Sequence, residues 1–148
     1  MLSAGWCELS DRCRNSHLRL TIGDTRGAPT VSRILIVDDD AGVLRLLASL
    51  FEDEGWDVDA ASGGTQALQM LESAPPAVIL LDLMMPGISG EELIGELHSR
   101  GLEVPVVVMS ARQNVAEVAE VTRAAGYLAK PFDIEDALTM VSQYAQSA

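Results

Sequence analysis

The sequence is poor in several kinds of residue, and each shortage restricts what the protein can be. Only two cysteines occur among 148 residues, Cys7 and Cys13, so no disulfide framework supports the chain beyond its amino-terminal region. Aromatic residues make up 4% of the chain, whereas hydrophobic residues make up 48%. This aliphatic composition excludes a disordered chain and fits the core of an α/β domain.

Basic residues are also scarce, with 10 Lys and Arg against 22 Asp and Glu and a formal net charge of −12. The imbalance belongs to residues 33–148, which hold 19 acidic and 6 basic side chains. A surface this negative repels phosphate backbones, so direct binding to nucleic acid is not expected. A cation or a basic protein partner is favoured instead.

Long apolar runs are missing as well. Each strand-like run is interrupted by a polar residue long before it could span a bilayer. The amino terminus lacks the apolar core of a signal peptide, because Glu8, Asp11 and Arg12 interrupt it. We therefore expect a cytoplasmic protein without membrane contact.

Residues 1–32 show no sustained hydrophobic period and end in a turn-forming stretch, Gly27 to Thr30. They predict a flexible extension ahead of one domain over residues 33–148. A related hypothesis is that Val31 is the natural first residue, read from a GTG start codon. Mass spectrometry of the protein from its native host would contradict it by finding peptides from residues 1–30.

From Arg33 onward, short apolar runs alternate with amphipathic segments. Strands are predicted over 33–37, 57–61, 77–81, 104–109 and 127–129, and helices over 41–54, 65–73, 90–99, 113–124 and 133–145. Runs of β-branched and aliphatic residues indicate strands buried on both faces, as in parallel sheets. Five βα units of this kind predict an α/β fold, a doubly wound parallel sheet with helices on both faces.

Four of the apolar runs end on reactive polar side chains: Asp38 and Asp39, Asp82, Ser110, and Lys130. Parallel sheets bind ligands at the carboxyl ends of their strands, so we expect these side chains to meet at one edge. Three close carboxylates raise one another's pKa unless a cation joins them, and their hard oxygen ligands select Mg²⁺.

Such a site suits phosphoryl transfer, which depends on positioning and on neutralising the phosphoryl oxygens. Asp82 would be the nucleophile, while Lys130 and Ser110 would contact the oxygens. Asp40 is expected to cap the first helix, and Pro131 to follow a cis peptide bond.

The strings ILIVDDD, LLDLMMPGISG, VVVMSA and YLAKPF resemble those of the receiver domain of two-component response regulators, and the resemblance runs from about Arg33 to the carboxyl terminus. It implies a flavodoxin-like, five-stranded sheet in the order 2-1-3-4-5 with five helices. By motif position, the resemblance implies the following site: phosphoacceptor Asp82, metal-binding Asp38 and Asp39, switch hydroxyl Ser110, lysine Lys130, aromatic switch Tyr127, and Met84 as a metal ligand through its backbone carbonyl.

The chain ends after the last predicted helix, so we expect a stand-alone, single-domain response regulator. The resemblance implies a sensor histidine kinase or histidine phosphotransfer protein as phosphoryl donor and an unidentified downstream protein as target. We expect no enzymatic activity beyond the protein's own aspartyl phosphorylation and dephosphorylation, and a monomer that dimerises at most weakly when phosphorylated.

Two departures from the family pattern concern the readout surface. The segment from Ser110 to Lys130 is about two residues shorter than is usual in the family, so the fourth helix or the turn after it must be trimmed. The last helix carries acidic residues but no Lys or Arg through Ala148. The charged dimer interface of winged-helix regulators therefore lacks half of its partners.

Three other functions remain as alternatives. A metal-dependent phosphatase or phosphotransferase with an aspartyl nucleophile usually has a second acid two residues further on, where this chain has Met84. An interaction module that has lost phosphorylation is disfavoured by Asp82 and Lys130. A DNA-binding regulator is disfavoured by the acidity and by the absence of an output domain in the sequence.

Overall fold

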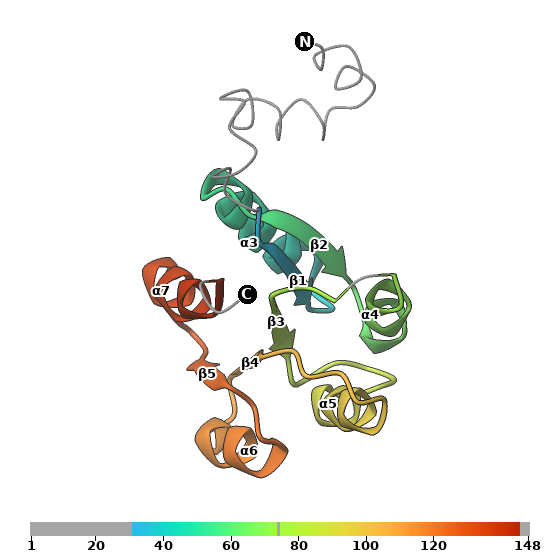
Figure 1. Cartoon of the computed structure of the whole chain (residues 1–148). Helices are drawn as coiled ribbons and strands as arrows, with labels where there is room; N and C mark the ends of the chain where they lie inside the picture. The colour runs from blue at the N-terminus through green and yellow to red at the C-terminus, as the bar shows by residue number, and fades with distance from the viewer. Residues whose placement is uncertain (1–30, 74, 146–148) are drawn as a thin grey trace. The chain divides into compact units, whose positions relative to one another are not determined.

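The computed structural model of the protein describes residues 31–73 and 75–145. The predicted extension, apart from Val31 and Ser32, lies outside these residues, and so do both cysteines. Within the described residues, strands and helices alternate along the chain (Figure 1). They are β1 (Arg33–Val37), α3 (Ala41–Asp53), β2 (Asp57–Ala61), α4 (Gly64–Leu71), β3 (Val78–Asp82), α5 (Gly90–Ser99), β4 (Val106–Ser110), α6 (Val115–Thr122), β5 (Gly126–Ala129) and α7 (Ile134–Ala145).

The strands form one sheet in the order β2-β1-β3-β4-β5, and every neighbouring pair is parallel. This confirms the predicted flavodoxin-like α/β fold with five helices. The register places Asp82 beside Met109 and Ser110 beside Ala129. Because parallel strands all point the same way, their carboxyl ends lie along one edge of the sheet.

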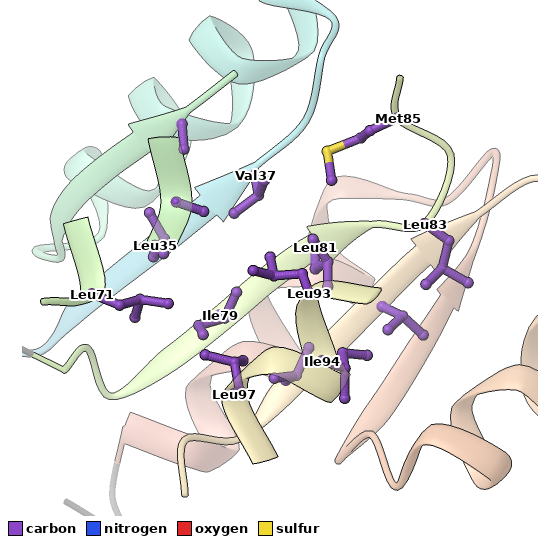
Figure 2. Close-up of a cluster of buried hydrophobic side chains, with 14 of the residues drawn as sticks. Leu35, Val37, Leu71, Ile79, Leu81, Leu83, Met85, Leu93, Ile94 and Leu97 are labelled. Atoms are coloured by element: carbon purple, nitrogen blue, oxygen red, sulfur yellow. The ribbon is translucent and has the colours of Figure 1, made fainter. Parts of the chain in front are cut away.

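Helices cover both faces of the sheet, as the alternating side chains of the strands require (Figure 1). On one face, α4, α5 and α6 pack on odd-numbered positions of β1 and β3, such as Leu35 and Ile79. Figure 2 shows this cluster, in which Leu93 and Leu97 of α5 lie over β3. On the other face, α3 and α7 pack on the even-numbered positions of the same two strands.

Helices α3 and α5 each begin at a residue whose side chain caps the helix. Asp40 caps α3 as predicted, since its Oδ1 accepts hydrogen bonds from the backbone N–H groups of Gly42 and Val43 at 2.9 and 3.2 Å. Ser89 and Glu92 form a reciprocal capping box at the start of α5. None of the helices within residues 31–73 and 75–145 is long and apolar enough to cross a membrane.

Several predicted boundaries are wrong by one or two residues, and two of these errors matter for the site. Strands β3 and β4 include Asp82 and Ser110 as their last residues, because hydrogen bonds continue past the apolar runs: Leu83 N–H donates to Met109 at 3.0 Å, and Lys130 N–H donates to the Ser110 carbonyl at 2.8 Å. These two side chains are therefore held by the sheet itself.

Helix α6 is shorter than the predicted span of 113–124. It ends at Thr122 because Arg123 adopts a left-handed conformation with φ 63°. The Ala124 N–H then donates to the Ala119 carbonyl at 2.8 Å, which closes the helix in the manner of a Schellman motif. Strand β5 begins three residues after Arg123, at Gly126.

Candidate functional site

The polar residues predicted at the strand ends lie along one edge of the sheet. Asp38 follows β1, and Asp82 and Ser110 are the last residues of β3 and β4. Lys130 follows β5, whose neighbour is β4. Asp38, Asp82 and Ser110 are all buried, with relative exposures of 0%, 5% and 0%. Polar side chains buried this deeply need partners, and here these are backbone N–H groups of the neighbouring loops and the Lys130 ammonium.

Asp38, Asp39 and Asp82 form an acidic cluster. Each offers one carboxylate oxygen, and these oxygens all lie within 4.8 Å of one another. Asp39 is exposed, so the cluster opens to solvent on its side. Hard oxygen donors from carboxylates are the ligands that Mg²⁺ takes, usually one or two together with waters. The residues therefore fit a divalent cation.

The electrostatics of Asp38 support the same conclusion. Burial raises the pKa of Asp38, and the neighbouring Asp82 carboxylate raises it further. The opposing influences are the Asp40 N–H, which donates to Asp38 Oδ1 at 2.9 Å, and the Lys130 ammonium. The net effect is a raised pKa, so the protein alone does not fully balance the negative charge. A bound cation would complete the balance.

Lys130 lies between the two buried carboxylates. Its Nζ is 3.4 Å from Asp38 Oδ2 and 3.5 Å from Asp82 Oδ2. The Lys130–Pro131 peptide bond is cis, as predicted. The ammonium therefore places a compact positive charge beside one oxygen of each carboxylate.

Ser110 and Met84 are held by backbone hydrogen bonds. Ser110 Oγ accepts a hydrogen bond from the Arg112 N–H at 3.0 Å. The Met84 N–H donates to Asp82 Oδ1 at 3.1 Å, which fixes the carboxylate, while the Met84 side chain is 55% exposed. The position two residues after Asp82 thus carries a thioether and no second acid, in contrast to the alternative phosphatase site.

Arg112 is a residue of this region that the sequence analysis does not single out. Its Nη1 donates to Glu91 Oε2 at 2.8 Å, and its Nε lies 3.3 Å from Met84 Sδ. The guanidinium therefore joins the loop after β4 to the start of α5 and to the loop after β3. No spacing in the sequence signals this contact, because Arg112 lies 21 residues from Glu91 and 28 from Met84.

Tyr127 lies on the neighbouring surface. Its side chain is 43% exposed and lines a groove of about 480 Å³ between β5 and α7, together with Phe132 and Met140. In this conformation the ring faces outward. The predicted switch role of Tyr127 requires the ring to move inward, and that movement would remove the ring from the lining of this groove.

Gly90 explains how α5 approaches the site. A Cβ at this position would lie 2.7 Å from Leu83 Cα and 2.9 Å from the Asp82 carbonyl oxygen, closer than packing allows. Only a residue without a side chain lets the helix begin against the Asp82 loop. The helix start thereby supports the backbone that carries Asp82.

Comparison with known proteins identifies the family. The family model for the response regulator receiver domain matches residues 34–142, which include every site residue described above. The chain belongs to this family.

Two similar proteins agree with this family assignment. The receiver domain is 41% identical over 108 residues to "Response regulator MprA" of Mycobacterium ulcerans, covering 72% of this chain and 47% of that protein. It is 36% identical over 117 residues to "Regulatory protein AtoC" of Escherichia coli, covering 78% of this chain and 25% of that protein. The chain therefore spans half or less of the length of these curated relatives.

A solved structure agrees with the fold. The receiver domain superimposes on the Francisella response regulator 1452 receiver domain with a TM-score of 0.74 and 28% sequence identity. The match covers 78% of this chain and 98% of the other.

Proposed function

We propose that this receiver domain accepts a phosphoryl group on Asp82 from a phosphohistidine of a sensor histidine kinase or a histidine phosphotransfer protein. The observation that carries the proposal is the position of Asp82, a buried carboxylate with Lys130 at 3.5 Å and two further acids beside it. A buried carboxylate with an ammonium on one side and a cation-binding cluster on the other is equipped to hold a phosphoryl dianion.

In the transfer, an Asp82 carboxylate oxygen forms the new bond to phosphorus while the bond from phosphorus to the donor imidazole nitrogen breaks. The bonding pair returns to the imidazole, which takes up a proton. The Met84 N–H holds the other Asp82 oxygen, so the attacking oxygen keeps a fixed direction. Lys130 neutralises one phosphoryl oxygen, and the Ser110 hydroxyl donates to another.

Receiver domains typically use Mg²⁺, and here Asp38, Asp39 and Asp82 would hold the ion together with the backbone carbonyl of Met84. When bound, the cation supplies positive charge to the phosphoryl oxygens. The chain's own residues then keep the site ordered: Asp40 fixes Asp38 through its N–H, and Lys130 pairs with both buried carboxylates.

The output is proposed to run through Ser110 and Tyr127. A hydroxyl that turns toward the phosphoryl group gives up its hydrogen bond from the Arg112 N–H, and the vacated space admits the Tyr127 ring. The groove beside Tyr127 then changes shape, and with it the face formed by α6, β5 and α7. A downstream protein reads that face.

The remaining features follow from the same proposal. The protein acts in the cytoplasm as a phosphorylated signalling partner, monomeric and at most weakly dimeric when phosphorylated. It turns over no external substrate, and its chemistry is limited to its own aspartyl phosphate. Its acidic surface favours protein partners over nucleic acid.

The Asp82→Asn variant tests the proposal. With acetyl phosphate and Mg²⁺, intact-protein mass spectrometry should find one added phosphoryl group on the wild type and none on the variant. Asp53→Asn, an exposed change at the end of α3, is the matched control and should be labelled like the wild type. Labelling of Asp82→Asn at the wild-type rate would refute the assignment.

A further inference from the structure

A second groove lies apart from Tyr127, at the start of α5 and along α6. It has a volume of about 460 Å³ and is lined by Glu91 of α5 and by Asn114, Glu117, Val118, Glu120 and Val121. Helices α5 and α6 are neighbours on one face of the sheet (Figure 1). Among the described residues, none of these side chains belongs to the proposed phosphorylation site.

The groove combines an exposed aliphatic side chain with three acidic ones. Val121 is 82% exposed, the largest exposure of any large hydrophobic side chain among residues 31–73 and 75–145. Val118 lies on the same face of α6 and is half-buried. Glu91, Glu117 and Glu120 line the same groove as the two valines, and the α6 segment VAEVAEVT holds no Lys or Arg.

We propose that this groove docks a cationic amphipathic helix of a partner protein, with an aliphatic side chain against Val118 and Val121 and Lys or Arg beside the glutamates. Helices bind to grooves in this way through an apolar stripe, while charges at the margin select the partner. A second copy of this chain is a poor occupant, because its net charge of −12 would bring acid against acid.

Arg112 ties this groove to the phosphorylation site. Its guanidinium pairs with Glu91 at 2.8 Å, so Glu91 adds little free charge to the groove in this conformation. Its backbone N–H donates to Ser110 Oγ at 3.0 Å, and its side-chain Nε contacts Met84 Sδ. The backbone N–H of Met84 in turn donates to Asp82 Oδ1. One residue thus contacts a groove acid, the switch hydroxyl and the residue beside the phosphoacceptor.

The coupling rests on the proposed phosphorylation of Asp82, whereas docking itself does not. A phosphoryl dianion on Asp82 competes with Glu91 for the guanidinium, and movement of Ser110 removes the hydrogen bond that anchors the Arg112 backbone. Arg112 then turns toward the phosphoryl group. Glu91 is released into the groove, which becomes more negative and holds the cationic helix more tightly.

Docking is tested with a fluorescein-labelled peptide of Leu, Ala and Lys, designed as an amphipathic helix, in a fluorescence anisotropy titration of the unphosphorylated protein. The double variant Glu117→Gln/Glu120→Gln should weaken binding by about fivefold. The control Glu52→Gln/Asp53→Asn changes the net charge equally on exposed positions of α3 and should weaken it by less than about twofold. Val121→Gln should weaken binding without changing charge.

The outcomes separate docking from general attraction. Equal loss in both double variants, or equal binding of a scrambled peptide of the same composition, would overturn the proposal, because charge alone would then explain the affinity. If Val121→Gln changes only the self-association of the protein in sedimentation, the groove is an interface between copies and the proposal is wrong.

The coupling is tested after labelling with acetyl phosphate and Mg²⁺, with phosphorylation verified by intact mass. Wild-type phosphorylation should tighten peptide binding by about three- to tenfold, and Glu91→Gln should remove this gain. Arg112→Gln should tighten binding before phosphorylation and show no further gain after it. If the labelled wild type binds no more tightly, the coupling is refuted. If no label is taken up, the proposed function fails together with the coupling, while peptide binding to the unlabelled protein still supports docking.

Discussion

Lys130 cannot neutralise both buried carboxylates at once. Its Nζ lies 3.4 Å from Asp38 and 3.5 Å from Asp82, so one positive charge is shared between two negative ones. Asp38 is the more deeply buried of the two acids, and burial is the main reason that its pKa is raised. The fold alone thus disfavours the charged form of a residue that would bind the cation.

This raised pKa predicts how stability depends on pH. The folded protein binds the Asp38 proton more tightly than the unfolded chain does, whose Asp has a pKa near the ordinary value of 3.8. As pH rises from that value through the raised one, the unfolded state releases its proton first, and the free energy of unfolding falls. Without metal, Asp38→Asn should therefore be more stable than wild type at neutral pH, by on the order of 1 kcal/mol.

Urea unfolding in EDTA at several pH values measures this difference. The gain should be present at pH 7 and shrink as pH falls toward the ordinary Asp pKa, because the wild-type carboxyl is then protonated too. An asparagine can still accept the hydrogen bond from the Asp40 N–H. Asp53→Asn serves as the exposed control, and a less stable Asp38→Asn at pH 7 would contradict the argument.

At the scale of elements, the start of α5 supports the loop that carries Asp82. Gly90→Ala should destabilise the protein by about 1–3 kcal/mol, since its Cβ would press on the backbone of Leu83 and Asp82. Because those atoms carry Asp82, the proposed phosphoacceptor, phosphorylation by acetyl phosphate should slow as well.

Gly95→Ala is the matched control on the same helix. A Cβ at Gly95 meets no heavy atom within 4 Å, so alanine should raise helix propensity and stabilise by up to about 1 kcal/mol. Thermal unfolding and the labelling rate of the two variants measure the contrast. Equal effects of the two substitutions would show that Gly90 serves no packing purpose.

Elements with sharp sequence limits could be predicted from the sequence, whereas element ends that depend on backbone pairing or backbone conformation could not. Strand β1 has its predicted bounds because its apolar residues stand between Arg33 and Asp38. Strands β3 and β4 extend one residue further than their apolar runs, since backbone pairing continues to Asp82 and Ser110 regardless of side-chain polarity. Helix α6 ends earlier than predicted because Arg123 adopts a left-handed conformation, which an arginine at this position does not predict.

The site shows the same division. The strand order brings Asp38, Asp82 and Lys130 together, so the fold class alone predicts their meeting. The Arg112 contacts with Glu91 and Met84 depend on how two loops and a helix start are placed, and no periodicity encodes that placement. Contacts made by long polar side chains on loops therefore cannot be predicted from sequence motifs.

At the scale of the whole molecule, a net charge of −12 acts on stability through self-repulsion as well as through the site. Two effects of added cations must therefore be separated. Salt of any kind screens the general repulsion and should stabilise the wild type and its variants alike. A specific ion at Asp38, Asp39 and Asp82 stabilises only a chain that retains these ligands.

Mg²⁺ should raise the unfolding temperature of the wild type beyond the rise produced by NaCl at the same ionic strength. Binding to the folded state alone adds about 2.7 kcal/mol when the ion is at 100 times its Kd, and the gain should saturate with concentration. Asp39→Asn changes an exposed member of the acidic cluster, so it should fold normally and lose most of the Mg²⁺-specific gain. EDTA should reverse the wild-type gain completely. If Asp39→Asn is stabilised by Mg²⁺ as much as the wild type, the ion acts on the general charge of the molecule and the acidic cluster is not its site.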